Sequence, residues 1–337
     1  PRGDAKDPLP LAPKPGTTVN DYPTGTPSRL GTEKEVPKTP ETPTTTKPST
    51  DTTTPGTGLI QTPDTTIPTT LAPLGGDLDT QLKSLPAFGT DETLEIGAWN
   101  IENYPKAADS KSVVAKVLNK LDIDIMAVEE INNTAVFEDL LKEMPKFSGV
   151  IAGQNGGQKS QNVGVIFRTE EFKLVESKDL FRGQNEAFPR PPLMVRLKPN
   201  KDPNNDIVAI VVHLKAFGDE DSITRREEAN VRLEEYTSQL LAKEPSLKIV
   251  VLGDFNQPLL TSSDRQVFRP WFDKPETYSV KTEALVKKND YTFFGGQRFS
   301  VIDHIVSSNN FTMQEPVVPK IQTVISSFEE RASDHLP

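Results

Sequence analysis

The sequence predicts a mixed α/β fold of two layered β-sheets, preceded by a long segment with no core of its own. From about residue 89, short apolar runs of strand length are interspersed with segments whose apolar residues recur at helical spacing. Several of the strand-like runs follow one another without a helix between them. That order favours two layered sheets over one purely parallel sheet.

Residues 1–88 have the composition of a linker or stalk. Half of the chain's 30 prolines fall in the first 75 residues, mixed with runs of threonine. Large apolar side chains are few there and show no period, so the segment cannot bury enough surface to offset its ordering entropy. The sequence therefore predicts a disordered Thr/Pro-rich region over residues 1–88, dispensable for chemistry, and one catalytic domain over residues 89–337.

The first half of the domain predicts two strand–helix units. Leu94–Trp99 has the pattern of a strand, and Ala108–Leu121 repeats valine and leucine along one helical face. Ile123–Val128 is a continuous apolar run, which is typical of a buried strand. Ala135–Met144 again has the apolar spacing of an amphipathic helix.

The elements that follow are mostly strands. Val150–Ala152 and Val163–Phe167 flank a loop rich in glycine, glutamine and asparagine, and Leu193–Leu197 and Ile207–Val212 are further apolar runs. The longest predicted helix then covers residues 221–242. Two last strands are predicted at residues 249–252 and 301–306.

Composition limits the function. The chain has 337 residues, a net charge of −10 and no cysteine, which excludes disulfides and a thiolate metal site. The acidic balance argues against a histone-like grip on nucleic acid, yet it leaves room for a hydrolase with a local basic patch. No apolar stretch approaches the roughly 20 residues that span a bilayer, so no stable membrane insertion is expected. A chain that starts at Pro1 is expected to be a processed or excised piece of a longer protein.

The three histidines of the chain stand at the ends of apolar runs. His213 lies in Val-Val-His-Leu-Lys, while His304 and His335 each follow an aspartate, Asp303 and Asp334. A carboxylate that accepts a hydrogen bond from imidazole fixes its tautomer and raises its basicity, which suits a general base. For any single histidine a structural role is the better expectation, but the three together predict a site. His213 could protonate a leaving alkoxide or bind phosphate as a cation.

Acids and amides follow other strands. Glu130 ends the run Ile-Met-Ala-Val-Glu-Glu and is a natural oxygen ligand for Mg²⁺, whereas Glu129 is expected to face the other way. Asn100 could hold a metal-bound water or a phosphate oxygen. Asp254 and Asn256 follow Gly253, which allows a sharp turn, and alternation sends both side chains to one side with Phe255 opposite.

Basic residues suggest where a phosphate would bind. Arg190 is framed by prolines, and its guanidinium could fork onto a phosphate. Lys159 and Lys215 are weaker candidates for contact with the substrate.

Taken in order, these motifs resemble the endonuclease/exonuclease/phosphatase superfamily, which includes deoxyribonuclease I and bacterial extracellular nucleases. The resemblance covers about residues 92–337 and rests on six motifs in sequence. They are Trp-Asn-Ile with Asn100, the acidic pair ending in Glu130, His-Leu-Lys with His213, Gly-Asp-Phe-Asn with Asp254 and Asn256, Asp303, and Ser-Asp-His with His335.

The resemblance implies a four-layer α/β sandwich of two packed mixed β-sheets with helices outside. It implies Mg²⁺ as cofactor, with Mn²⁺ or Ca²⁺ as alternatives. It implies Glu130 as the principal metal ligand, with Asn100 and Asp334 nearby, and His335 as the general base, oriented by Asp303. It implies His213 as general acid or phosphate binder. Asp254 and Asn256 would bind phosphate, water or a second ion, and Arg190 would be the arginine on the phosphate side.

Two departures from the resembled family stand out. Glu129 occupies the position where the family usually has glutamine, and the chain ends two residues after His335, where members continue into a closing strand. A missing C-terminal strand is therefore expected.

The function expected from the resemblance is a metal-dependent phosphodiesterase that hydrolyses nucleic acid with a water activated by His335 and Asp303. A monomeric, secreted DNase-like endonuclease, extracellular or at the cell surface, fits the retained His213 and the Thr/Pro stalk, with the periplasm as an alternative. The main alternative function is a phosphatase or phosphodiesterase acting on lipid or inositol phosphate headgroups. A non-catalytic adhesion module that keeps the fold is a third alternative.

Overall fold

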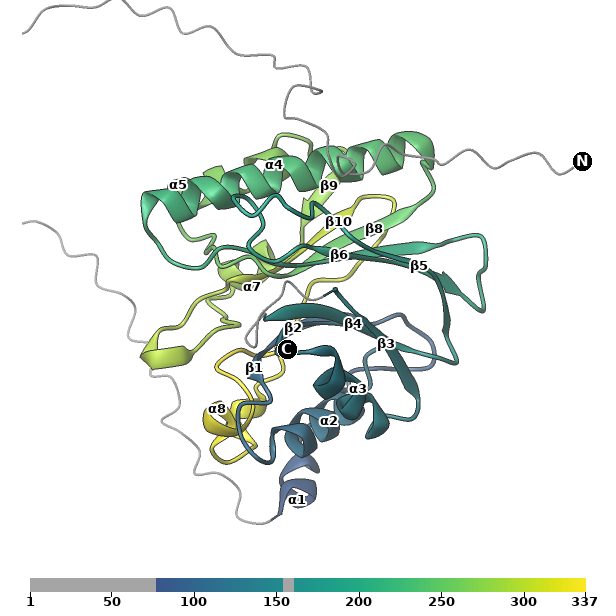
Figure 1. Cartoon of the computed structure of the whole chain (residues 1–337), viewed down its shortest axis with the longest axis vertical. Helices are drawn as coiled ribbons and strands as arrows, with labels where there is room; N and C mark the ends of the chain where they lie inside the picture. Colours follow the sequence, from purple (N-terminus) through teal and green to yellow (C-terminus); the bar gives the residue numbers. More distant parts are fainter. Residues whose placement is uncertain (1–76, 154–160) are drawn as a thin grey trace, which may run out of the picture. The chain divides into compact units, whose positions relative to one another are not determined.

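The computed structural model describes residues 77–153 and 161–337. Two β-sheets pack face to face, and helices lie on their outer sides, as Figure 1 shows for α2 and α3 below the four-stranded sheet and α4 above the six-stranded one. This arrangement confirms the predicted mixed α/β sandwich. In the described part of the chain, no helix combines the length and the apolar character needed to cross a membrane.

The smaller sheet has the strand order β1-β2-β4-β3, with β1 and β2 parallel and the other neighbours antiparallel. The larger sheet has the order β5-β6-β7-β8-β10-β9, in which only β7 and β8 run parallel. The strands are β1 Ile96–Tyr104, β2 Ile125–Ile131, β3 Phe147–Ile151, β4 Asn162–Arg168, β5 Phe172–Asp179, β6 Leu193–Pro199, β7 Ile207–His213, β8 Lys248–Asp254, β9 Tyr278–Val280 and β10 Asp303–Ser308.

Three long helices match the apolar spacing of the sequence, and the remaining ones are short. Asp219 caps α4 by accepting a hydrogen bond from the amide of Ser222 at 2.9 Å. The helices are α1 Leu78–Leu82, α2 Ser110–Leu121, α3 Thr134–Lys142, α4 Glu220–Lys243, α5 Ser262–Val267, α6 Arg269–Phe272, α7 Glu283–Lys287 and α8 Phe328–Arg331, with 3₁₀ turns at Gly295–Gln297 and Ile321–Thr323.

Two apolar cores hold the layers together. One lies between the sheets and includes Val165, Val195, Val211 and Val250, all fully buried. The other lies between the outer face of the small sheet and its helices, and includes Trp99 and Leu121. Strand alternation supplies both cores from β1 and β2, because successive side chains point to opposite faces of a sheet. Two strands, β5 and β9, were not predicted: β5 is largely exposed, and β9 has only three residues.

The predicted boundary at residue 88 is wrong, because residues 77–88 belong to the folded domain. Leu82 and Leu85 are buried in the outer core, and the amides of Phe88 and Gly89 both donate to the Leu121 carbonyl at 3.0 Å. The Pro/Thr-rich composition of residues 1–88 as a whole predicted disorder, although its last part contains the short helix α1 with leucines on one side. Residues 1–76 lie outside the described part of the chain.

Two truncations test this boundary. Deleting residues 1–76 should leave stability unchanged. Deleting residues 1–88 should lower the free energy of unfolding by about 4 kcal/mol or more, because each leucine lost from a core costs roughly 2–5 kcal/mol. Urea denaturation of both truncated proteins and the full chain measures the difference. Equal midpoints for the two truncations would show that α1 does not contribute to the core.

Candidate active site

Three neighbouring strands of the large sheet align three of the predicted site residues. His213 ends β7 opposite Asp254 of β8, and Asp254 in turn faces Asp303 of β10. All three are almost fully buried. Adjacent strands lie roughly 5 Å apart, so this register sets the three side chains in one row across the ends of these central strands.

Gly253 makes the close approach at the end of β8 possible. Its φ is +126°, and a Cβ on it would lie 2.3 Å from the Val212 carbonyl oxygen. Beyond it, Asn256 adopts a φ of +53°, and its backbone N–H donates to Asp254 Oδ1 at 2.7 Å. Asp254 and Asn256 both line the cavity described below, while Phe255 is buried, as alternation predicts.

Glu130 reaches the site from the other sheet through an irregularity in β2. The pairing register shifts after Val128, and Glu130 has a left-handed φ of +63°. A bulge of this kind re-aims a side chain at the end of a strand. The backbone N–H of Asn103 donates to Glu130 Oε2 at 2.8 Å and holds the carboxylate in place.

Asn100 joins the acids of the two sheets. Its amide nitrogen donates to Glu130 Oε1 at 3.3 Å and to Asp254 Oδ2 at 3.0 Å, while its oxygen accepts from the Glu102 amide at 3.0 Å. In this arrangement the side-chain nitrogen of Asn100 orients two carboxylates. Its side-chain oxygen points away from them, so the side-chain amide would have to rotate by half a turn for that oxygen to bind a metal beside the carboxylates.

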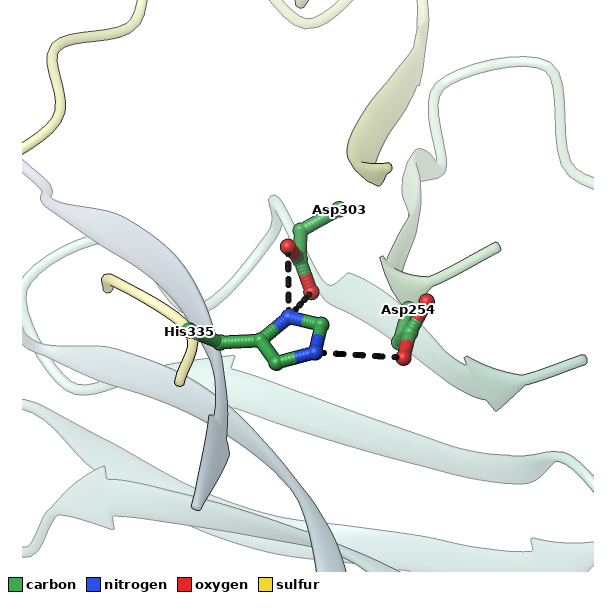
Figure 2. Close-up of side chains that lie close together, drawn as sticks. All are labelled: Asp254, Asp303 and His335. Atoms are coloured by element: carbon green, nitrogen blue, oxygen red, sulfur yellow. Dashed lines mark hydrogen bonds and ion pairs between the residues drawn. The ribbon is translucent and has the colours of Figure 1, made fainter. Parts of the chain in front are cut away.

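His335 and Asp303 form the predicted pair. The His335 Nδ1 lies 2.9 Å from Asp303 Oδ2 and 3.1 Å from Oδ1, and Figure 2 shows the ring between Asp303 and Asp254. The His335 Nε2 is 3.9 Å from Asp254 Oδ2 and 3.8 Å from Asp334 Oδ1. Asp303 thus fixes the Nδ1–H tautomer and leaves Nε2 as the proton-accepting atom.

The backbone holds His335 in place although it lies close to the end of the chain. The Trp99 indole donates to the His335 carbonyl at 3.1 Å, and the Leu336 amide donates to the Thr292 carbonyl at 2.7 Å. Leu336 is fully buried in the outer core. The position of the ring therefore rests on packing as well as on Asp303.

The acidic surroundings control the protonation of His335. Burial alone would lower its pKa, but the charges of Asp303, Asp254 and Asp334 raise the pKa of His335 to about 10. Burial, with the nearby Asp303, raises the pKa of Asp254 to about 7. The surrounding negative charge causes the rise in the pKa of His335. Any cation that neutralises these carboxylates therefore favours the neutral, basic form of the ring.

His213 has the opposite environment. Burial, together with the positive charges of Arg190 and His335, lowers the pKa of His213 well below its usual value. Its Nε2 lies 3.7 Å from Glu130 Oε1 and 3.6 Å from Asp254 Oδ2. A neutral His213 can donate a hydrogen bond to a phosphate oxygen, but it lacks the charge of the cationic role predicted for it.

Glu129 does not face away from the site as expected. Its carboxyl is fully buried and has no hydrogen-bond partner within the described residues, and its Oε1 would lie 2.7 Å from a Cβ on Gly253. Burial, then the charges of Asp303 and Asp254, raise the pKa of Glu129 well above its usual value. Glu129 therefore lies beneath the site rather than on the opposite face.

A cavity of about 920 Å³ opens over these residues. Arg190 lines it and donates to the Leu214 carbonyl at 3.3 Å and to Gln161. Lys215 lines the same cavity, and its contact with the substrate stays a prediction. Lys159, the other predicted substrate contact, lies outside the described residues. The sequence did not predict the other lining residues, which are Glu102, Asn103, Gln161, Pro189, Ala216, Phe217, Arg225, Phe293, Arg298 and Ile302.

One missed residue carried a signal in the sequence. Glu102 lies two positions after Asn100, in Trp-Asn-Ile-Glu-Asn, and its Oε2 accepts from the Asp334 amide at 3.0 Å. The third histidine does not reach the site. His304 is fully buried, with Nδ1 2.7 Å from the Thr282 hydroxyl and Nε2 2.7 Å from the Gln257 carbonyl, which is a structural role.

The donor set fits a divalent cation. Asp254, Asp303 and His335 each place one ligand-type atom within 4.8 Å of the others, but His335 and Asp303 are already paired with each other. The Glu130 Oε1 and Asp254 Oδ2 oxygens both lie against the Asn100 side-chain nitrogen, so Glu130 adds a carboxylate oxygen to this cluster. The buried Asp334 Oδ1 has no hydrogen-bond partner in the part of the chain that the structure describes. Clustered carboxylate oxygens suit hard ions such as Mg²⁺, Mn²⁺ and Ca²⁺.

Comparison with known structures supports the fold. A mannosyl-6-phosphatase from Bacteroides thetaiotaomicron superposes with a TM-score of 0.53 at 19% identity, covering 72% of this chain and 97% of that one. D. rerio TDP2 complexed with a single-strand DNA product gives 0.53 at 15% identity, with 72% and 96% covered. The human Nocturnin catalytic domain with a bound sulfate gives 0.50 at 15% identity, with 64% and 82% covered. At these identities the neighbours establish the fold alone.

The sequence places the chain more firmly than these structures do. No curated protein matches it. A family profile, however, matches residues 92–327, which is well over half of the chain. The chain belongs to the endonuclease/exonuclease/phosphatase family.

Proposed function

We propose that the protein is a metal-dependent phosphodiesterase that hydrolyses nucleic acid, in the manner of a DNase-like endonuclease. Family membership and the neighbouring folds support a phosphoester hydrolase. The observation that carries the proposal is the His335–Asp303 pair, whose Nε2 faces the acidic cluster within a large cavity lined by both acidic and basic side chains.

The residues divide the chemistry between them. His335 Nε2 accepts a proton from the attacking water, and Asp303 holds the ring through Nδ1–H and stabilises the imidazolium. As the new P–O bond forms and the ester P–O bond breaks, His213 and Asn256 donate hydrogen bonds to phosphate oxygens, and solvent protonates the leaving alkoxide. Glu130, with Asn100 and Asp334 beside it, would hold a divalent cation, which would supply Lewis-acid stabilisation of the phosphate charge.

The cavity favours a polyanion over a small phosphate monoester. Four basic residues, Arg190, Lys215, Arg225 and Arg298, line it beside four carboxylates, Glu102, Glu130, Asp254 and Asp334. With a cation bound at the carboxylates, the basic residues offer more positive charge than one phosphate needs. D. rerio TDP2, a neighbour in fold, carries a single-strand DNA product in its structure. We propose Mg²⁺ as the physiological ion and, from the Thr/Pro-rich N-terminal composition, an extracellular or cell-surface location for a monomeric protein.

A substrate panel tests the proposal. The purified chain is incubated with plasmid DNA, single-stranded DNA, RNA, sphingomyelin, a phosphoinositide and a sugar phosphate, in Mg²⁺ and in excess EDTA. Cleavage of nucleic acid in Mg²⁺ alone is expected. Faster hydrolysis of a lipid, inositol phosphate or sugar phosphate at matched metal and salt would replace the nuclease with the phosphatase or lipid phosphodiesterase alternative.

Arg190 should contribute mainly to substrate binding. Arg190→Gln is expected to raise KM by roughly tenfold, because a hydrogen bond to a charged group contributes about 1.5–3 kcal/mol, and to flatten the salt dependence of KM. Steady-state kinetics at several salt concentrations measure both. Arg196→Gln is the control, since Arg196 binds Asp206 and Glu244 outside the cavity. An unchanged KM would exclude the proposed phosphate contact.

A further inference from the structure

Phe217 is an exposed aromatic residue in an unusual backbone conformation at the candidate active site. It lines the cavity, it is 73% exposed, and its φ of +81° lies in a region that bulky residues rarely adopt. Keeping a large apolar ring in water and a strained backbone at one position is unfavourable on both counts. Such outliers persist where the surrounding structure enforces them, and they cluster at functional sites.

Buried hydrogen bonds fix the loop that carries Phe217. Arg226 of α4 is 2% exposed, and its Nη1 donates to the carbonyls of Lys215 and Phe217, each at 2.7 Å. Its Nε donates to Gln257 Oε1 at 2.9 Å, and the Gln257 carbonyl lies 2.7 Å from His304 Nε2. A chain of contacts thus ties the loop to β10 beside Asp303, so the ring is presented on a rigid support.

A cation accompanies the ring. The Lys215 ammonium lies 4.4 Å from the centroid of the Phe217 ring. Arg225 lines the same cavity, but its guanidinium binds the carbonyls of Glu186 and Asn185 and pairs with Asp221 at 3.7 Å, so Lys215 is the cation beside the ring. An aromatic face beside positive charge is the combination that holds a single nucleic-acid strand, since bases stack on the ring and the backbone binds the cations.

We propose that Phe217 is a stacking platform for an unpaired nucleobase next to the scissile phosphate, and that Lys215 binds a neighbouring phosphate. The inference rests on the proposed nuclease function and makes its substrate single-stranded or locally opened nucleic acid. A paired base has both faces covered by its neighbours, so it must leave the stack to reach the ring.

A lipid surface is the weaker partner for this ring. Membrane docking needs a contiguous apolar patch, whereas the Phe217 ring is flanked by Lys215 and borders a cavity rich in charged side chains. The geometry around the ring therefore favours a base over an acyl chain.

The test compares Phe217→Leu with the wild-type chain on two single-stranded oligodeoxynucleotides of equal length. One carries bases throughout, and the other carries abasic residues on both sides of the cleavage position. On the first, kcat/KM should fall by roughly tenfold, mostly through KM, and Phe217→Tyr should restore it. On the abasic strand, the variant and the wild type should be nearly equal. Phe299→Leu is the control, because Phe299 is 49% exposed but does not line the cavity.

Other outcomes overturn the inference in distinguishable ways. Equal losses on both strands would assign Phe217 a purely structural role while leaving the nuclease proposal intact. Cleavage of neither strand by the wild type in excess Mg²⁺ would remove the nuclease proposal and this inference with it. Co-sedimentation with phosphatidylcholine vesicles that depends on Phe217, without any effect on DNA cleavage, would assign the ring to membrane docking.

Discussion

His335→Ala and Asp303→Asn should each lower kcat by roughly 10²–10⁴-fold, the usual contribution of a positioned general base. The double variant should be little worse than the more damaged single variant. Residues that act as one unit lose their joint contribution when either is removed. The 2.9 Å contact between His335 Nδ1 and Asp303 Oδ2 makes these two residues such a unit.

The physical reason lies in the tautomer of the ring. Asp303 accepts from Nδ1–H, so the lone pair of His335 stays on Nε2, toward Asp254 and the cavity. An asparagine at position 303 can donate to Nδ1 instead, which moves the ring proton to Nε2 and removes the base from the side where water would attack. The geometry of the site would survive while its proton acceptor would not.

A double-mutant cycle on kcat at saturating substrate and metal measures this coupling. Melting temperatures of all variants separate a lost base from a lost fold, because both side chains are buried. A control cycle uses Lys288 and Glu315, an exposed ion pair at 2.7 Å, whose removal should leave kcat unchanged. Multiplying losses at His335 and Asp303 would show that the two act independently.

The sequence predicted the strand-end residues because they follow local rules. A buried apolar run ends, a polar residue follows, and neighbouring strands bring such ends together; His213 and Asp254 meet in this way. Asp303 joins them from the start of the antiparallel strand β10. His304 shows the limit of that rule. It ends no strand and lies one residue inside β10, where alternation turns it away from Asp303 and toward Thr282.

The features that escaped prediction depend on backbone irregularity or on distant packing. The shifted register of β2 turns Glu130 into the site while Glu129 also remains beneath it, and simple alternation predicts opposite faces. The positive φ of Phe217 has no signature in a loop without glycine at that position. The leucines of α1 could not be predicted as core residues, because they pack on the core between the small sheet and its helices, which distant parts of the sequence form.

Removing the charge of Glu130 should have the other large effect. Glu130→Gln keeps the shape of the side chain, but it removes the negative charge that a cation would meet. It also replaces one of the two oxygens that accept hydrogen bonds from Asn100 and Asn103 with a donor. Metal stabilisation of the developing phosphate charge contributes several kcal/mol, so kcat should fall by about 10²–10³-fold. The metal concentration that gives half-maximal activity should rise as well, because an amide oxygen is a weaker ligand than a carboxylate for a hard cation.

Titration of activity with Mg²⁺ and with Mn²⁺, together with calorimetric metal binding in the absence of substrate, separates weaker metal binding from slower chemistry. Glu176→Gln is the matched control, since Glu176 is an exposed carboxylate on β5 outside the cavity lining. If Glu130 is the principal ligand, the calorimetric affinity falls in Glu130→Gln and stays unchanged in the control. Full activity of the wild type in excess EDTA would contradict the metal-dependent mechanism itself, whereas normal metal affinity in Glu130→Gln would move the ion to the carboxylates of Asp254, Asp303 and Asp334.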